Sequence, residues 1–358
     1  QAIFEVYLSL LREVVIVVVT GLKRVFFEKE ALSYPIGRQI YDCMKSNGYE
    51  AQFLKSHNRV TDIPGKTPRE AFFQGKSTLV VGVRKTLDFA SCKPSAHYQL
   101  PLVTGCEGIC EYCYLNTQLG KKPYTRIYVN VEEILEQAAV LIQQRQPNIT
   151  LFEAAATSDP VAVEPYSGSL ARAIEFFSGQ EFGRLRFVTK FTGIDSLVKL
   201  DHGGHTRIRY SINSDKVIRS YEHRTPSLSQ RMQALSQIIE AGYPSGVIIA
   251  PVILTEGWQE DYRGALDDLA RHINYKPGMD FAFEVITHRF TSRARSNILD
   301  VFPHTDLPMD EKTDRKYKYG QFGYGKYVYD DNIIIEMKAF FMEEIARLFP
   351  QATIDYFI

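Results

Sequence analysis

Three cysteines stand close together in the segment TGCEGICEYCYLNTQLG, residues 104–120, although the chain has five cysteines in all. Cys106, Cys110 and Cys113 follow the spacing C-x3-C-x2-C. Three thiolates at this spacing can hold three irons of a [4Fe–4S] cluster, which leaves the fourth iron without a protein ligand. That iron can bind the amino and carboxylate groups of S-adenosylmethionine, which the reduced cluster cleaves to a carbon radical. The spacing therefore predicts radical chemistry on unactivated C–H bonds.

A structural zinc site is the alternative use of such a triad. Zinc sites usually combine two C-x2-C or Cys/His spacings and supply four protein ligands. Here only one such pair exists, and the candidates for a fourth ligand include Cys92 and His97, upstream of the triad. The triad also follows a predicted strand, where α/β barrels carry their chemistry. Iron–sulfur ligation is therefore the favoured interpretation.

The overall composition is that of an ordinary globular protein. The chain has 358 residues, of which 45% are hydrophobic and 23% charged, enough for two or three domains or one barrel with additions. Its formal net charge is zero, so a nucleic-acid partner requires a local basic surface. An odd number of cysteines favours a reducing cytoplasm over a disulfide framework. The uncharged run at residues 14–20 is shorter than the ~20 residues of a membrane span, so we expect no membrane association.

Apolar, β-rich runs alternate with helical patterns along most of the chain. The predicted strands are 78–83, 99–105, 149–156, 185–191, 206–213, 246–253 and 281–290. The predicted helices are 131–146, 169–179, 228–242, 258–273 and 333–349. Such alternation implies right-handed crossovers and a parallel sheet that is covered on both faces. Residues 99–290 have room for about six βα units, which predicts a partial barrel, with an open doubly wound sheet as the alternative.

The predicted fold class is α/β, a partial (β/α)6 TIM-type barrel with an N-terminal α/β extension and a C-terminal β-hairpin and helix region. The expected divisions are 1–95, 96–290 for the barrel, and 291–358. In the last region, RKYKYGQFGYGKYVY (315–329) sets three glycines among aromatic and basic residues. This pattern predicts a hairpin with an exposed aromatic tip.

The chain resembles the spore photoproduct lyases of the radical S-adenosylmethionine superfamily. The cysteine spacing, with the aromatic Tyr112 before the last cysteine, matches the superfamily signature. The closer resemblance rests on KSTLVVGVRKTL (76–87), CKPSAHYQLPLVTGC (92–106), CYLNTQLG (113–120), FEAAATSD (152–159), LRFVTK (185–190), RYSIN (209–213), HRF (288–290) and YGKYVY (324–329). These blocks run in order from about Lys23 to the end of the sequence, so the match is specific to one family.

The resemblance implies a DNA repair lyase that reverses 5-thyminyl-5,6-dihydrothymine, the ultraviolet-induced lesion of spore DNA, to two thymines. It implies a [4Fe–4S] cluster on Cys106, Cys110 and Cys113, with S-adenosylmethionine as cofactor. The 5′-deoxyadenosyl radical formed from this cofactor takes a hydrogen from C6 of the lesion. An electron donor such as flavodoxin or ferredoxin is also implied. We expect a cytoplasmic monomer, located in the spore in spore-forming species.

The resemblance also implies further site residues. Cofactor contacts are expected from Tyr112, Ser158, Lys190, Ser211, Asn213 and Ala250. Contacts to the lesion or to DNA are expected from Tyr114, Ser158, His288, Arg289, Gln321, Phe322, Tyr324 and Lys326. Tyr112 and Tyr114 are candidates for radical relay, with packing over the cluster as the alternative. Lys190 and His288 have alternatives too, as a solvated strand-end lysine and a core histidine.

Ala156 departs from the family pattern. The family carries a hydrogen-donating cysteine in the segment F-E-A-x-C-T-S-D, where this chain has alanine. Alanine has no thiol from which a hydrogen atom could come. Three explanations are open: an engineered replacement, a subfamily that uses a tyrosine or Cys92 instead, and a different substrate. The unchanged FEAA before and TSD after this position favour the first two.

The hairpin is the second departure, because the family's Arg-Tyr pair is replaced by Gln321-Phe322. Phenylalanine still serves as a wedge between bases, but glutamine adds no charge towards phosphate. DNA affinity is therefore expected to rest on nearby cations: Arg289, Arg293, Arg295, Arg315, Lys316, Lys318 and Lys326. A dinucleotide lesion must leave the duplex to reach a barrel mouth. The alternative functions are a radical enzyme of the same lineage with another substrate, and a non-catalytic, metal-containing DNA-binding protein.

Overall fold

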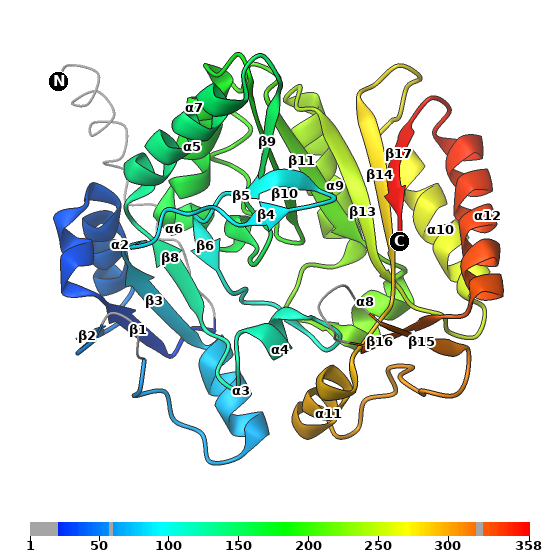
Figure 1. The fold of residues 1–358 in the computed structure, drawn as a ribbon, viewed down its shortest axis with the longest axis horizontal. Helices are drawn as coiled ribbons and strands as arrows, with labels where there is room; N and C mark the ends of the chain where they lie inside the picture. Colours follow the sequence, from blue (N-terminus) through cyan, green and yellow to red (C-terminus); the bar gives the residue numbers. More distant parts are fainter. Residues whose placement is uncertain (1–20, 57–59, 320–324) are drawn as a thin grey trace.

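Two β-sheets lie side by side in the computed structural model, which describes residues 21–56, 60–319 and 325–358 (Figure 1). The smaller sheet has five strands, and the larger has eight and curls into a half-barrel with helices on its outer face (Figure 1). The expected mixed α/β architecture is therefore confirmed as a curled half-barrel. Residues 1–20, which include the apolar N-terminal run, lie outside the described residues.

The smaller sheet has the strand order β2–β1–β3–β8–β6. Its strands are β1 (Arg24–Phe27), β2 (Ala51–Phe53), β3 (Thr78–Gly82), β6 (Val103–Thr104) and β8 (Thr125–Tyr128). All its ladders are parallel except that between β6 and β8. Helices α2 (Pro35–Ser46) and α3 (Pro68–Lys76) belong to the same part of the chain. The sheet takes strands from both sides of the division expected between residues 95 and 96, which stays a prediction.

The larger sheet has the order β17–β14–β13–β11–β10–β9–β5–β4. Its strands are β4 (Ser91–Cys92), β5 (Ala96–Gln99), β9 (Thr150–Glu153), β10 (Gly183–Thr189), β11 (Thr206–Ile212), β13 (Ser245–Val252), β14 (Phe281–Thr287) and β17 (Thr353–Phe357). Only the β4–β5 ladder is antiparallel. Because parallel strands end at one common edge, residues that follow β9, β10 and β11 come together there.

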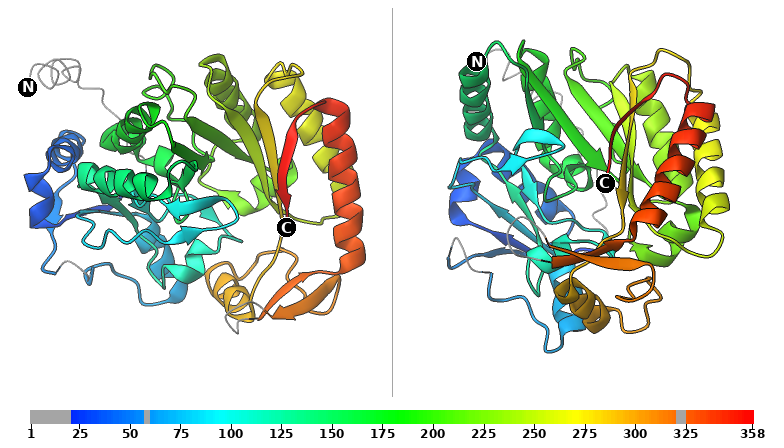
Figure 2. Two further views of the ribbon diagram at one scale, coloured as in Figure 1. Left: turned by 45° about the horizontal axis from the view of Figure 1, so that its top comes forward. Right: turned by 45° about the vertical axis from the view of Figure 1, so that its right-hand side comes forward.

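Amphipathic helices cover the outer face of the half-barrel (Figure 2). They are α5 (Val131–Arg145), α7 (Ser169–Ser178), α9 (Leu228–Glu240), α10 (Trp258–His272) and α12 (Asp331–Leu348). Helix α9 shows the pattern, because Met232, Leu235 and Ile238 are buried at helical spacing. Its start is fixed by a capping box between Ser227 and Gln230.

One predicted strand differs in the structure, and one connection, for which no helix was predicted, departs from strict strand–helix alternation. The strand expected at 99–105 is divided, because Pro101 has no N–H for a ladder bond and separates β5 from β6. Between β10 and β11, residues 190–205 form turns and no helix, so strict strand–helix alternation is interrupted there. The finer six-unit description of the barrel therefore stays a prediction.

The C-terminal region contains α11 (Ser292–Val301) and the hairpin of β15 (Arg315–Tyr319) and β16 (Gly325–Tyr329). A bridge between Phe290 and Tyr327 ties this hairpin to the chain that leaves β14. The antiparallel pairing confirms the predicted hairpin arms. Its tip, with Gln321, Phe322 and Tyr324, lies outside the described residues.

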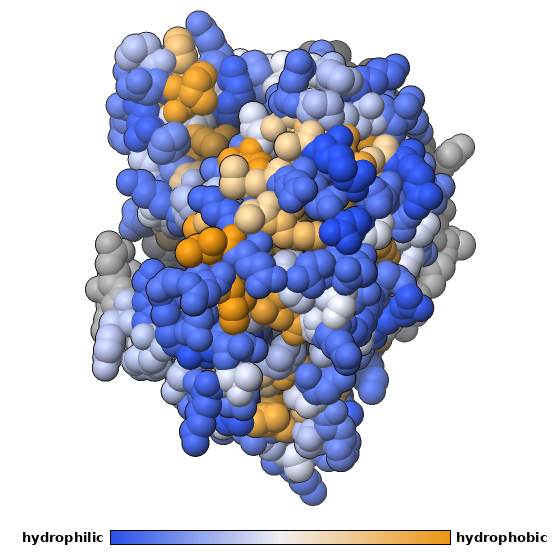
Figure 3. Space-filling model, turned by 90° about the vertical axis from the view of Figure 1, so that its right-hand side faces the viewer, coloured by the Kyte–Doolittle hydropathy of each residue, from blue (hydrophilic) through white to orange (hydrophobic). Residues whose placement is uncertain are grey.

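No helix within the described ranges is both long and apolar enough to cross a bilayer. Figure 3 views the side of the molecule that carries α12, where apolar and hydrophilic side chains are intermixed. Ile335 and Met342 of α12 are among the exposed apolar residues. Scattered exposed apolar side chains are normal on protein surfaces.

Candidate active site

The cysteine segment forms a loop between β6 and β8, two neighbouring strands of the smaller sheet. Within the loop lie β7 (Ile109–Cys110) and α4 (Leu115–Gln118). Strand β7 pairs with β12 (Glu222–His223), so that Cys110 lies opposite Glu222. In Figure 1 the loop lies across the open side of the half-barrel. It is therefore held by the smaller sheet at both ends and by β12 in the middle.

Gly105 brings the first cysteine to the strand-end edge of the half-barrel. Its φ of +81° is left-handed, and a Cβ atom here would lie 2.3 Å from the backbone oxygen of Tyr124. Its N–H donates to the oxygen of Thr157 over 2.9 Å, and it forms a bridge with Ser158. Only glycine combines this conformation with so close a backbone contact.

The three thiols share one partly buried environment. Cys110 is buried, and Cys106 and Cys113 are half-buried. Burial raises the pKa of Cys106 to about 12, and burial followed by Glu222 raises the pKa of Cys110. The other thiols add to both shifts, so the three sulfurs lie within electrostatic reach of one another. The N–H of Gly108 also donates to Cys106 Sγ over 3.3 Å.

This donor set fits an iron–sulfur cluster better than a zinc ion. In the part of the chain that the structure describes, no group of three or more His, Cys, Asp or Glu side chains converges on a single metal position. A cluster does not need that, because each thiolate binds a different iron. His97, a candidate zinc ligand, accepts the Leu151 N–H at Nδ1 over 2.9 Å. Three sulfurs around a shared space are soft ligands suited to iron and sulfide.

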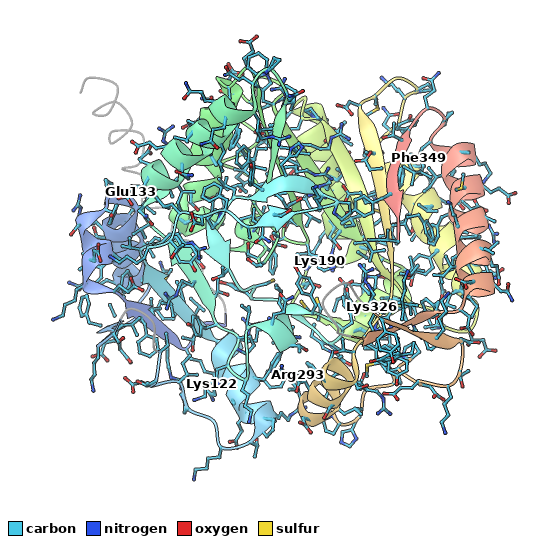
Figure 4. The ribbon with its side chains drawn as sticks, viewed as in Figure 1. Lys122, Glu133, Lys190, Arg293, Lys326 and Phe349 are labelled. Carbon is cyan, nitrogen blue, oxygen red and sulfur yellow. The ribbon has the colours of Figure 1, made fainter. Side chains whose placement is uncertain are left out.

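Lys190 contacts two of the other residues that were expected to bind the cofactor. It follows β10 directly, and its Nζ donates to Ser211 Oγ over 2.7 Å and lies 3.4 Å from the Tyr112 hydroxyl. In Figure 4, Lys190 lies between the strands of the half-barrel and α4. The structure thus brings Tyr112, Lys190 and Ser211 together at one point beside the cysteine loop.

Glu222 is the fourth member of this network. No motif or spacing in the sequence around it identified it as a site residue. Its buried carboxylate accepts from the Tyr112 hydroxyl, lies 3.3 Å from Lys190 Nζ and pairs with Arg231 over 2.6 Å. Burial favours a higher pKa, but Lys190 and Arg231 outweigh it and hold the pKa of Glu222 below its usual value. The buried Arg231 and the half-buried Lys190 around one carboxylate leave an excess positive charge. That excess suits a ligand carboxylate.

The remaining expected cofactor residues lie along the same edge. Ser158 follows β9 and donates its hydroxyl to the Ala154 oxygen over 3.3 Å. Asn213 follows β11 and donates to the Pro251 oxygen over 2.7 Å, so its amide holds the ends of β11 and β13 together. Ala250, on β13, is half-buried beside this contact. All three therefore border the position of Lys190 and Ser211.

Tyr114 connects the cysteine loop to Ala156. Tyr114 is partly exposed as a residue, and its hydroxyl donates to the Ala156 backbone oxygen. Burial of its hydroxyl end raises the pKa of Tyr114, followed by the influence of Cys113 and Cys92. The Cys92 thiol on β4 is therefore near the same phenol. Burial, followed by Glu153, raises the pKa of Cys92 to about 11, so its S–H stays protonated at neutral pH.

Arg289, Lys318 and Lys326 form a cationic group on the hairpin, where Lys318 pairs with Lys326 next to the tip end of the described arms. The pKa of Lys326 is lowered by burial and then by Arg289 and Lys318. Among the described residues, none of the three forms an ion pair with a carboxylate. In Figure 4, Lys326 lies on the hairpin, above Arg293 of α11. Unpaired cations in this position suit an anionic partner such as a phosphate.

Arg315 and Lys316, two of the other cations expected on this surface, are already engaged. Arg315 is buried: it donates to the His288 oxygen over 2.6 Å and lies 3.5 Å over the Tyr329 ring. Lys316 pairs with Asp331. The expectation of an exposed Arg315 is therefore wrong, because the residue starts β15 and faces the core.

His288 is held by the same arginine. It is 2% exposed, and Arg315 lies 3.1 Å from its Nδ1. Burial, followed by Arg315, lowers the pKa of His288 to about 3, so the ring stays neutral. Its role in substrate contact stays a prediction.

Comparison with known proteins places these features in one family. The sequence model described as spore photoproduct lyase matches residues 22–358. The spore photoproduct lyase of Clostridium acetobutylicum is 51% identical over 336 residues, covering 94% of this chain and 98% of that protein. The corresponding protein of a Geobacillus species is 47% identical over 335 residues, with 94% and 98% covered.

A solved spore photoproduct lyase has the same fold, with a TM-score of 0.90, 46% identity and coverage of 95% of this chain and 100% of that one. It is a double mutant, cysteine to alanine and serine to cysteine, with bound AdoMet and dinucleoside spore photoproduct. The family match covers both sheets, the cysteine loop and the hairpin described above. The chain belongs to the spore photoproduct lyase family and is thus a radical S-adenosylmethionine lyase.

Proposed function

We propose that this protein is a DNA repair lyase that converts the spore photoproduct to two thymines. Its cofactors are a [4Fe–4S] cluster on Cys106, Cys110 and Cys113 and S-adenosylmethionine, which together supply the 5′-deoxyadenosyl radical that takes a hydrogen atom from the lesion. The observation that carries the proposal is the position of the cysteine loop beside the Lys190 network. A solved relative that binds AdoMet and the lesion supports it.

Lys190 and Ser211 bind the carboxylate of the cofactor in this proposal. The network of Lys190, Arg231 and Glu222 has two cations and one anion in a buried setting, so an incoming carboxylate balances its charge. Arg231 also donates to the Ser211 backbone oxygen over 3.0 Å, which fixes the strand end. The site is therefore ordered before the cofactor arrives, which lowers the entropy cost of binding.

The cationic group at the hairpin binds DNA phosphates, and the hairpin tip fills the gap that the flipped-out lesion leaves. Arg289 and Lys326 stand where the chain leaves β14 and enters β16, beside the edge that carries the cofactor residues. The lesion is thereby guided into the half-barrel opening. Damaged bases stack poorly, so their extrusion costs less than that of intact bases.

Cys92 replaces the missing donor at Ala156 in this proposal. It lies near Tyr114, whose hydroxyl contacts the Ala156 oxygen, and its high pKa preserves the S–H bond. The S–H bond breaks and a C–H bond forms on the thymine methylene radical, which leaves a sulfur radical at Cys92. The hydroxyl hydrogen of Tyr114 restores the thiol. A methyl hydrogen of 5′-deoxyadenosine, the by-product of the first hydrogen transfer, then restores the tyrosine and gives back the 5′-deoxyadenosyl radical, which is available to re-form S-adenosylmethionine with methionine.

An anaerobic assay tests the function. Reconstituted protein is incubated with S-adenosylmethionine, dithionite and a spore-photoproduct dinucleotide, and products are followed by mass spectrometry. Lesion-dependent release of thymines supports the proposal. Cleavage of the cofactor while the lesion stays intact indicates another substrate. If the reconstituted protein has no iron–sulfur absorbance, zinc becomes the favoured metal.

The proposal also includes the electron donor and the oligomeric state of the protein. A low-potential flavodoxin or ferredoxin reduces the cluster in the cytoplasm, and the protein acts on DNA as a monomer. Light scattering of the reconstituted protein tests the monomer. Replacement of dithionite by reduced flavodoxin tests the donor, since product formation is then expected to continue.

A further inference from the structure

Lys76 is a buried lysine that contacts the cysteine loop. It is the last residue of α3, and its side chain lies in the interior, with the residue 2% exposed. Its Nζ donates to the backbone oxygen of Cys106 over 2.9 Å and lies 5.7 Å from the centre of the Phe72 ring. The ammonium group thus lies against the residue that carries the first thiol.

No carboxylate in the described segments forms an ion pair with this ammonium group. Glu107 is near enough for Lys76 to lower its pKa, but burial dominates and raises that pKa, and its carboxylate accepts the Tyr166 hydroxyl over 3.0 Å. Asp159 accepts instead from Thr189 and from the Lys190 N–H. A buried cation whose only close partners are a carbonyl and a ring is costly unless a negative charge compensates it.

Lys190, the other cation near the thiols, differs in this respect. Its Nζ lies 3.3 Å from the buried Glu222 carboxylate and donates to Ser211. Its ammonium group therefore has a carboxylate partner within the protein, which it shares with Arg231. Lys76 has no such partner among the described residues. Its helix end packs closely on the neighbouring chain, because a Cβ atom on Gly75 would lie 2.6 Å from the Lys122 carbonyl carbon.

We propose that Lys76 is the buried counter-charge of the iron–sulfur cluster and raises its reduction potential. The inference rests on the proposed function, since it requires the cluster. A cluster with three thiolates is negatively charged and gains one more negative charge on reduction. In a low-dielectric interior an adjacent ammonium stabilises the reduced state more than the oxidised state. Lys76 is thus a tuning residue that makes the cluster easier to reduce.

Lys76→Gln isolates the charge, because the amide still donates a hydrogen bond but carries no charge. Lys76→Arg keeps the charge. Lys122→Gln is the matched control: Lys122 also donates to a backbone oxygen, that of Ile63, and lies well away from Lys190 in Figure 4. The midpoint potential of each reconstituted, full-length protein is measured by redox titration with the electron paramagnetic resonance signal of the reduced cluster.

We expect Lys76→Gln to make the potential more negative, so that at the midpoint of the unmodified protein the ratio of reduced to oxidised cluster falls about tenfold, or ~59 mV for one electron. Lys76→Arg and Lys122→Gln should change that ratio less than about twofold, or ~18 mV. An unchanged potential in Lys76→Gln with full iron content overturns the inference. No cluster signal in the unmodified protein overturns the proposed function as well, so the two failures are distinguishable.

Thermal unfolding of the cluster-free chain gives a second, independent measurement if Lys76→Gln does not retain iron. Removal of an unpaired buried cation should leave Lys76→Met at least as stable as the unmodified chain. A lower melting temperature in Lys76→Met shows that Lys76 has a structural role, which also overturns the inference.

Discussion

The hydroxyl of Tyr114 donates a hydrogen bond to the backbone oxygen of Ala156. The same phenol lies within electrostatic reach of the Cys92 thiol. One side chain, next to the last cysteine of the triad, thus connects the position where the family has its donor cysteine with a second thiol. In the function proposed above, this arrangement lets Cys92 take the place of the donor that is missing at residue 156.

Cys92→Ala should therefore abolish clean repair while leaving cofactor cleavage intact. We expect the dithymine yield per cleaved cofactor to fall at least about tenfold, a loss of ~1.4 kcal/mol. Because thiol hydrogens exchange with solvent, deuterium uptake from D2O into thymine should fall in parallel. Product and by-product analysis by mass spectrometry measures both quantities.

Ala156→Cys serves as the matched rescue. Added to Cys92→Ala, it should restore the yield, and alone it should lower by-products. Unchanged turnover and by-products in Cys92→Ala would show that neither thiol position matters and that the hydrogen comes from elsewhere.

Lys190→Met should weaken cofactor binding without unfolding the protein. Removal of Lys190 leaves Glu222 paired with Arg231, a neutral arrangement. Loss of a charged hydrogen bond of ~1.5–3 kcal/mol should raise the dissociation constant for S-adenosylmethionine about 10–100-fold. Anaerobic calorimetry of the cluster-loaded protein measures it. Lys216→Met, which removes an exposed lysine beside Asp261, is the control and should bind normally.

Glu222→Gln should destabilise the fold itself. The substitution leaves the buried Arg231 and the half-buried Lys190 without a carboxylate between them. Breaking a buried ion pair in this way costs about 3–5 kcal/mol. Urea denaturation of the full chain measures the loss. Adding Lys190→Met to Glu222→Gln should recover part of the stability; no recovery would mean that the two residues do not interact.

Glu164 should make the stability of the protein depend on pH. Its buried carboxylate accepts the N–H groups of Leu170 and Ala171 over 2.8 and 2.9 Å, yet burial raises its pKa from 4.5 to about 8. The folded state then binds the proton more tightly than the unfolded state. This contribution is complete below pH 4.5 and is lost as the pH rises towards about 8.

Glu164→Gln removes that titration. Relative to this variant, the unmodified protein should lose ~3–4 kcal/mol of unfolding free energy between about pH 5 and 8. His288 acts in the opposite direction, since its pKa of about 3 makes the fold less stable as the pH falls below 6.5. Both proteins retain His288, so its effect cancels in the comparison. Parallel pH profiles for the two proteins would contradict the prediction.

Lys326→Ala should weaken DNA binding in a salt-dependent manner. Lys326 has no carboxylate partner among the described residues, whereas the buried Arg315 is engaged with His288 and Tyr329. Loss of one phosphate contact should reduce the slope of log affinity against log salt by about 1. Fluorescence anisotropy with lesion-containing duplex DNA at several salt concentrations measures the slope. An unchanged slope would place Lys326 outside the DNA contact.

Local sequence patterns predicted most of the fold. The runs at β3, β10, β11 and β14 are rich in β-branched, aromatic and other apolar residues, so their strands are where they were expected even though Arg186, Arg209 and Glu284 stand within them. The division between β5 and β6 was also readable, because Pro101 stands in the middle of the expected strand. The turns between β10 and β11 could not be located from periodicity, which shows the absence of a helix but not the path of the chain.

The candidate site was predicted less completely, for a physical reason. Cysteine spacing is a local feature and pointed to Cys106, whereas Lys190 and Ser211 were expected from the family resemblance. Glu222 lies on a two-residue strand, and the Tyr112 hydroxyl that it accepts is 110 residues away in the chain. Lys76 at a helix end is typical of a surface lysine in sequence. Burial and partners such as these arise only from long-range packing.

The position of the cysteine loop between β6 and β8 has a consequence for synthesis. The smaller sheet can close once residue 128 has left the ribosome, whereas β12, which pairs with Cys110, ends at residue 223. Synthesis proceeds at about 5–20 residues per second, so β12 follows the smaller sheet after roughly 5–20 s. During this interval both ends of the cysteine loop are held in the smaller sheet, but β12 is not yet available to pair with Cys110. For the cluster proposed above, this is a period during translation in which iron and sulfide carriers would reach Cys110 before β12 pairs with it.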